Sequence, residues 1–257
     1  MVFRKSDGST RPSLRLPMVK TFLRSFLLQT SWNFERLQNL GFLFMMLPGL
    51  RSIYRGDIPE DVLERHKQYF NTHPFFAPMI AGATLRLEAS LVKEGDDQVD
   101  IADFKQMVMA PLAAIGDSLF WGGIRPLASI IALFMALQGS LWAPVIFLVL
   151  FNIPHFLCRG GGLMLGYLGG LSAIESIQRF HLPDLSVRCK EGSIILLGVM
   201  CAFLAYRGCN LQDIPSFWGF VVLPVVLLFA RFARQGISSL FLILVTTTSL
   251  LAIALVF

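Results

Sequence analysis

Apolar positions dominate the second half of this chain, whereas the first half mixes apolar and charged positions. Continuous apolar stretches of the kind that cross a bilayer begin only after residue 105. Several have about 16 residues rather than the ~20 of a full span, so some are expected to be tilted, distorted or only partly across. The predicted spanning helices are Phe120 to Leu137, Leu141 to Leu157, Gly192 to Tyr206, Phe217 to Phe232 and Ser238 to Phe257.

The part before residue 106 has a different texture. A basic arm over residues 1–21 leads into Phe22 to Leu50, where apolar residues recur at helical spacing without excluding charge, which predicts an amphipathic helix at the membrane interface. The stretch from His73 to Leu85 is too short and too rich in proline to span alone, which predicts a re-entrant segment. The charged tract from Arg86 to Lys105 is expected to lie in water.

These patterns predict an all-α integral membrane protein. It combines several transmembrane helices with re-entrant or broken segments that contain proline and glycine, and with an amphipathic N-terminal helix. We expect a single membrane domain over residues 1–257. Within it, residues 1–21 form a cytoplasmic arm, 22–105 an amphipathic and re-entrant part, and 106–257 the transmembrane part.

Composition supports a membrane protein, because 54% of residues are hydrophobic and 15% are charged, against roughly 25% charged in soluble domains. The net charge of +5 comes from bases in the N-terminal arm and at segment ends. That distribution places the arm in the cytoplasm and argues against nucleic-acid binding. Bases on every second linker predict an external C-terminus. The four cysteines lack metal-ligand spacing, so no metal site is expected.

The motif SWNFERLQ begins at Ser31. On a helix, Trp32, Glu35 and Asn39 would share a face, with Asn33 on the adjoining side. A carboxylate and an amide could take the hydroxyls of a hexose while the indole covers its C–H face. The alternative is an interfacial helix with a tryptophan anchor.

The motif FNTHPFFAP places Asn71 and His73 just before Pro74. Residues before proline avoid the helical region, so this is a break between a helix and an apolar segment. Asn71 could cap a helix or hydrogen-bond a ligand. His73 suggests a phosphotransfer or proton-relay role, although a histidine beside a proline turn is more often a loop or cap residue.

The stretch from Ala110 to Ala128 is nearly all apolar, yet it carries Asp117 and Arg125. Lone charges in apolar surroundings cost several kcal/mol unless they are paired or wetted. In an unbroken helix the two residues would lie roughly 12 Å apart along the axis. A break at Gly122 and Gly123 could bring them together, either as a polar site or hinge or as a structural ion pair.

Together, SWNFERLQNLGF, FNTHPFFAP and MAPLAAIGDSLFWGGIRP resemble, in this order, the IID subunit of the mannose/fructose/sorbose family of the sugar phosphotransferase system. The resemblance implies a multi-pass subunit of the bacterial cytoplasmic (inner) membrane that pairs with a IIC subunit and assembles into a higher oligomer of IIC–IID pairs. The pair would move a hexose or amino-hexose inward, and IIB, phosphorylated by IIA, would phosphorylate it. No cofactor, phosphohistidine or catalysis is expected of this chain alone.

The predicted function is therefore one half of a sugar-translocating channel. One alternative is a non-transporting scaffold that recruits cytoplasmic phosphotransferase proteins through residues 86–105. Another is a lipid-headgroup transferase, which the absence of paired acids in the apolar segments argues against. Glu35 would accept sugar hydroxyls, and Asp117 with Arg125 would set a gate. The predicted lining of the path is Trp32, Asn33, Glu35, Asn71, Asp117 and Arg125.

Overall fold

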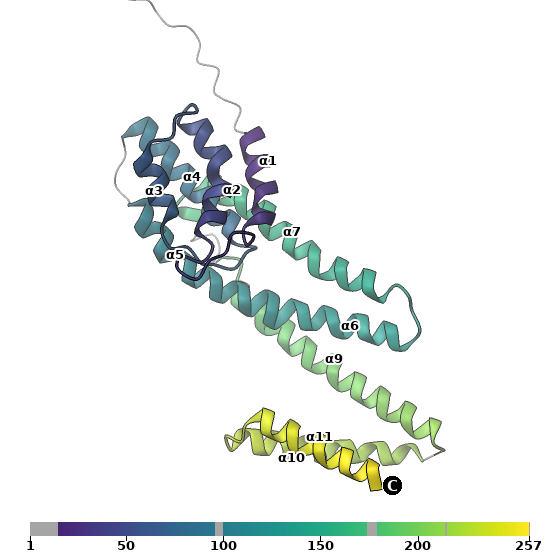
Figure 1. Ribbon diagram of the computed structural model, residues 1–257. Helices are drawn as coiled ribbons and strands as arrows, with labels where there is room; N and C mark the ends of the chain where they lie inside the picture. The colour runs from purple at the N-terminus through teal and green to yellow at the C-terminus, as the bar shows by residue number, and fades with distance from the viewer. Residues whose placement is uncertain (1–14, 96–99, 174–178, 214, 257) are drawn as a thin grey trace, which may run out of the picture. The chain divides into compact units, whose positions relative to one another are not determined.

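A computed structural model describes residues 15–95, 100–173, 179–213 and 215–256. The described residues are helices and connecting turns, and their only β-type pairings are isolated bridges. The chain forms two compact units, Met1–Ile194 and Ile195–Phe257, which are described separately below. The predicted all-α membrane architecture is thereby confirmed (Figure 1).

Helix α4 (Ala77–Glu94) is the centre of the first unit. It packs against α7 (Ala143–Gly169), α2 (Asn39–Ile53) and α5 (Ile101–Gly116). Its first half is buried, because small and apolar residues line every side of it. Most of the stretch expected to be re-entrant forms the first turns of this 18-residue helix. A proline is tolerated in a first turn because the N–H groups there have no helical partner.

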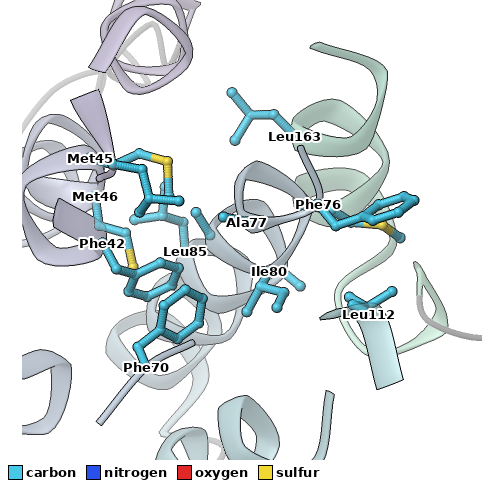
Figure 2. Packing of buried hydrophobic residues seen from close by; sticks show 14 of the residues in the cluster. Phe42, Met45, Met46, Phe70, Phe76, Ala77, Ile80, Leu85, Leu112 and Leu163 are labelled. Atoms are coloured by element: carbon cyan, nitrogen blue, oxygen red, sulfur yellow. The ribbon is translucent and has the colours of Figure 1, made fainter. Parts of the chain in front are cut away.

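The core of the first unit lies between α2, α4 and the turn before α4 (Figure 2). The Phe42 and Phe70 rings stack with centroids 3.8 Å apart, and Met45, Met46 and Leu85 pack nearby. The predicted interfacial helix over 22–50 is instead divided. It contains the end of α1 (Arg15–Arg24), then η1 (Ser25–Leu27), a turn and most of α2. Most apolar residues of α2 are buried in the protein core, whereas Leu40 and Phe44 are exposed.

Helix α3 (Glu60–Lys67) follows α2 and packs against it. Its acids Glu60 and Asp61 lie in the first turn, and its bases lie in the last turn. This arrangement complements the partial charges at the two ends of the helix.

Glycines bring α4 and α7 into close contact. A Cβ added at Gly166 would collide with the Met79 carbonyl oxygen, and one at Gly82 would collide with the Leu163 carbonyl oxygen. The two backbones therefore touch at both points, as small residues allow in helix pairs within membranes.

Among the described residues, three helical segments are long and apolar enough to span a membrane: Ile101–Leu137, α7 and α9 (Leu182–Leu211). They contain nearly all of the first three predicted stretches and extend beyond them. The first consists of α5, η2 (Asp117–Ile124) and α6 (Arg125–Leu137) without interruption. The predicted break at Gly122 and Gly123 is therefore wrong, and the segment passes through a π-helix, η2.

The second unit contains the end of α9, then η3 (Ser216–Val221), α10 (Val222–Arg234) and α11 (Ser239–Val256). Helix α10 packs on η3 and ends with Arg231 and Arg234. Many large apolar side chains of this unit are exposed, as suits helices solvated by lipid.

Candidate functional site

The SWNFERLQ motif forms a tight turn and not the helix expected from its spacing. The Asn33 carboxamide oxygen accepts the Arg36 N–H at 2.7 Å, and its NH₂ donates to the Asn39 oxygen at 2.9 Å. The Asn33 and Leu37 backbones exchange two hydrogen bonds of 3.1 and 3.0 Å. Asparagine side chains favour such local bonds over helix, which explains the error.

This turn sets where the two predicted sugar contacts lie. Leu37 has φ of 53°, a left-handed conformation that costs a side-chain-bearing residue roughly 1–2 kcal/mol. Trp32 is 45% exposed and meets Phe34 edge-on, with centroids 4.9 Å apart. Glu35 is exposed beside Arg36, 3.3 Å away. The indole and the carboxylate are therefore accessible, whereas Asn33 is engaged within the turn.

The second motif is attached to this turn by hydrogen bonds. The Gln38 N–H donates to the Phe70 carbonyl at 2.9 Å. The Gln38 carboxamide donates to the Thr72 carbonyl at 3.0 Å and accepts the Thr72 N–H at 3.1 Å. Gln38 is buried, so these bonds are shielded from water. The first two motifs therefore form one structural unit, and Asn71 is half-buried within it.

The third motif meets the second at His73. The Thr72 hydroxyl donates to the Met109 carbonyl at 2.9 Å. The His73 ring stacks on Phe120 with centroids 5.2 Å apart and planes 14° apart. Gly116 lies directly against the His73 side chain, where any Cβ would collide with it. All three motifs thus converge on the turn before α4.

His73 itself is buried and incompletely satisfied. Its Nδ1 accepts the Phe75 N–H at 3.3 Å, and its Nε2 has no hydrogen-bond partner within the described ranges. Burial, together with the positive Arg159 and with His155, lowers the pKa of His73 to about 4. The imidazole is therefore neutral near pH 7, and its free nitrogen fits a water or a ligand hydroxyl.

One wall beside His73 is held by α7. Arg159 donates from Nε to His155 Nε2 at 2.7 Å and from Nη1 to the hydroxyl and carbonyl oxygens of Ser25. Its guanidinium carbon lies 4.5 Å from the Phe26 ring centroid, and the His155 ring stacks on Phe75 at 3.8 Å. This bonding fixes the aromatic wall and ties η1 to α7.

Asp117 and Arg125 do not pair with each other. Asp117 is exposed at the start of η2, and its carboxylate has no hydrogen bond or ion pair to any described residue. Arg125 is also exposed, and its guanidinium carbon lies 5.7 Å from the Trp121 ring centroid. The structural ion pair considered from the sequence is therefore wrong, and both charges face outward from an apolar helix.

A buried polar network was missed in the sequence, because Glu88 belongs to the tract expected in water. Its carboxylate is fully buried and binds His66 Nε2 at 2.8 Å, the Tyr54 hydroxyl at 2.6 Å and Arg65 Nη2 at 3.2 Å. Lys105 is also expected in water from the sequence, but it is buried and donates to the Arg65 carbonyl at 2.6 Å.

The charge state of this network follows from its contacts. Burial alone would raise the pKa of Glu88, but the His66, Tyr54 and Arg65 contacts outweigh it and hold that pKa below its ordinary value. Both carboxylate oxygens accept hydrogen bonds, so the network joins α3 to α4 and leaves the carboxylate no free oxygen for a ligand. Val62 and His66, four residues apart on one buried face of α3, were the available signal in the sequence.

The sequence is similar to known proteins of one family. A model of the phosphotransferase system (PTS) mannose/fructose/sorbose family IID component matches residues 16–206. The mannose-specific EIID component of Escherichia coli K12 is 39% identical over 178 residues, which are 68% of this chain and 62% of that protein. The fructose permease IID component of Bacillus subtilis is 34% identical over 187 residues, 72% and 66% of the two chains. The match thus spans less than two thirds of the Escherichia coli relative.

Two solved structures are similar over most of their length. One, described as the structure of a membrane protein, has a TM-score of 0.73 and 28% identity, and covers 93% of this chain and 95% of that one. The other, the mannose transporter ManYZ in complex with microcin E492, has a TM-score of 0.57 and 27% identity with the same coverage. The chain belongs to the IID components of the mannose/fructose/sorbose family of the phosphotransferase system.

Proposed function

We propose that this chain forms, with a IIC subunit, one half of a sugar channel in the bacterial cytoplasmic membrane. The pair moves a hexose or amino-hexose inward, and a IIB protein, recharged by IIA, phosphorylates the sugar. Membership of the IID family supports the system and the membrane setting. The relatives named for mannose, fructose and sorbose support a hexose as cargo.

The outward-facing Asp117 carries this proposal. It lies within a 37-residue apolar helical segment and has no partner among the described residues. A charge turned toward acyl chains costs several kcal/mol, so intramembrane charges face a partner or an aqueous path. Arg125, about two turns further along, is exposed on the same segment. A IIC subunit and a water-filled sugar path would satisfy both charges.

The proposed lining keeps the six residues predicted from the sequence, with roles adjusted to the geometry. Trp32 would stack on the C–H face of the sugar, and Glu35 would accept its hydroxyls, because both are exposed. Asn33 shapes the turn that presents them. Asn71 lies next to Thr72, which joins the first two motifs through Gln38. Asp117, at the start of η2, and Arg125, at the start of α6, would line the sugar path.

Radiolabelled hexose uptake tests the proposal. The chain would be expressed with its cognate IIC and IIB in bacteria that lack their own mannose-family system. Asp117→Asn should lower uptake about tenfold or more, because a charge-assisted hydrogen bond contributes roughly 1.5–3 kcal/mol. Asp103→Asn is the matched control: Asp103 is exposed in the first turn of the same helix, and uptake should stay at the wild-type level.

Membrane content and co-purified IIC are measured for each variant, so that loss of assembly is separated from loss of transport. Wild-type uptake by Asp117→Asn would contradict the role of this carboxylate. A wild-type complex that takes up no hexose yet still binds IIB would support the scaffold function instead.

A further inference from the structure

A second polar cluster lies where η2 meets the first turns of α9, outside the residues proposed above. The Ser186 hydroxyl donates to the Ser118 carbonyl at 2.8 Å, and the Ser118 and Ser186 hydroxyl oxygens lie 2.8 Å apart. Lys190 Nζ donates to the Ser118 hydroxyl oxygen at 2.9 Å. Ser186 is buried in the contact between η2 and α9, whereas Lys190 is exposed, so the cluster extends from this contact to the surface.

The glycine pair of η2 makes room for this contact. A Cβ at Gly123 would lie 3.1 Å from the Cys189 Cβ, and a Cβ at Gly122 would lie 3.1 Å from the Lys190 Cε. A Cβ at either position would be tight, so that Cys189 and the Lys190 side chain would have to move by a few tenths of an ångström. The glycines that suggested a break in the sequence therefore provide the surface against which Lys190 lies.

The hydrogen-bond donors of the cluster can be counted. Ser186 uses its hydrogen on the Ser118 carbonyl, so the bond between the hydroxyls is donated by Ser118. The Ser118 oxygen then accepts from Lys190. An ammonium has three N–H donors, and the other two of Lys190 have no acceptor within the described part of the chain. The two serines thus fix a lysine that keeps donors available.

An unpaired acceptor lies one residue away. Asp117 directly precedes Ser118, is exposed, and has no partner among the residues described. A sugar hydroxyl can accept from an ammonium and donate to a carboxylate, so a neutral polyhydroxylated ligand satisfies both groups. An anionic ligand would be repelled by the carboxylate, which favours the free sugar over its phosphate ester.

We propose that Lys190 binds hydroxyl groups of the translocated sugar, and that Ser118 and Ser186 act as positioning residues for its ammonium group. This site rests on the proposed function and adds a binding residue from α9 to it. Asp117, the residue before Ser118, would supply the acceptor that complements this donor.

The test uses the purified complex of this chain with its IIC subunit. Equilibrium binding of radiolabelled mannose is measured, and the KM and maximal rate of uptake are measured in cells. Lys190→Met should raise Kd and KM about 10- to 100-fold, the loss expected for charge-assisted hydrogen bonds, while the maximal rate changes little. Arg188→Met is the matched control, because Arg188 is exposed on the same helix and pairs only loosely with Glu191, 3.8 Å away. It should bind and transport like the wild type.

The positioning role needs its own readout. Ser186→Ala should raise KM a few-fold, since the lysine loses its fixed anchor but keeps its charge. Ser186→Thr restores a hydroxyl at the same place and should return KM toward the wild-type value. Equal KM values for the alanine and wild-type proteins would overturn the positioning role.

Three outcomes would overturn the sugar site. The first is a wild-type Kd and KM in Lys190→Met. The second is loss of co-purified IIC in that variant, which would make Lys190 an interface residue. The third is unchanged mannose binding with lost binding of mannose 6-phosphate, which would make it a product site. If the wild-type complex neither bound nor took up mannose, fructose or sorbose, the proposed function would fail as well.

Discussion

His73 lies where the three sequence motifs meet, between Phe120 and the hydrogen-bonded wall of α7. Burial and the neighbouring Arg159 and His155 lower its pKa to about 4. The folded protein therefore resists placing a proton on this ring, whereas the unfolded chain accepts one near the ordinary value of 6.5. Acid should consequently favour unfolding, because the unfolded state binds more protons in that interval.

The pH dependence of stability tests this environment. Above pH 6.5 the ring is mostly neutral in both the folded and the unfolded state. As the pH drops to about 4, protonation of the unfolded chain lowers the free energy of unfolding by up to about 3 kcal/mol. His73→Phe keeps an aromatic ring against Phe120 but cannot be protonated. Its melting temperature should therefore fall less between pH 7 and pH 4 than that of the wild type.

Thermal unfolding in detergent at several pH values provides the measurement. The control is His181→Asn, since His181 is exposed beside Asp184 and asparagine tolerates its positive φ of 46°. Its acid response should match the wild type. Burial also lowers the pKa of His66, so some acid sensitivity should persist in every variant. If the melting temperature of His73→Phe fell as much in acid as that of the wild type, the His73 ring would not be shielded from water.

Single residues were the hardest level to predict from the sequence. The three motifs lie together in the structure, but the first forms a turn and not the expected helix, because Asn33 bonds within its own turn. Glu88 is expected in water from the sequence, because its partners Tyr54, Arg65 and His66 belong to other parts of the chain. A linear pattern carries no record of such partners.

At the level of helices, the contact between α4 and α7 depends on the absence of side chains at Gly82 and Gly166. The two glycines lie on different helices, and each faces a carbonyl oxygen of the other helix. Crossings of this kind are stabilised by close backbone packing rather than by large apolar side chains.

A pair of alanine substitutions tests this contact. Gly166→Ala should destabilise the protein by roughly 1–3 kcal/mol, because its methyl group meets the Met79 backbone and the helices must move apart. Gly161→Ala on the same helix meets nothing within 4 Å and should be neutral, or stabilising by up to about 1 kcal/mol. Melting temperatures of the two variants in one detergent give the comparison. Equal shifts would mean that the helices do not touch there.

Helices were predicted better than their ends and interruptions. The apolar stretches correctly indicated membrane helices, but Pro111 and the glycine pair did not break the first one. Prolines and glycines are tolerated in membrane helices where neighbours and wider turns satisfy the backbone. Pro126 lies in the first turn of α6, and the glycines lie within η2, so each is accommodated locally.

At the level of the whole molecule, the linker charges make a prediction about orientation. The connection at 138–140 carries no base, whereas the region between Arg159 and Glu191 carries several. Positive linkers remain in the cytoplasm, so we expect the first connection and the C-terminal end to lie outside.

Alkaline phosphatase fusions measure this directly, because the enzyme is active only outside the cytoplasm. Fusions after Gly139 and after Phe257 should be active, and a fusion after Gly170 should be inactive. The first and third positions lie on either side of α7, so opposite activities are required if α7 spans the bilayer. An inactive C-terminal fusion would contradict the orientation, and each fusion is compared at equal membrane content.

The organisation of the whole chain was only partly visible in its sequence. The change in composition near residue 105 marks where long apolar stretches begin, yet α5 starts at Ile101 and packs on α4 within the first unit. The boundary between the compact units falls after Ile194, inside the continuous apolar helix α9. Composition follows the solvent around a segment, and compactness follows contacts, so the two divisions need not coincide.

The wide turns of η2 have a consequence for how this protein can change over generations. A π-helix holds more residues per turn than an α-helix, so it absorbs inserted residues that a regular helix would have to expel. Loss of one codon within 117–124 would let this stretch return to ordinary helical spacing without turning α6 far from its present side, because a wide turn already holds the extra residue. We therefore expect single-residue deletions here to be tolerated better than deletions within α5 or α6, where each lost residue turns the rest of the helix by about 100°.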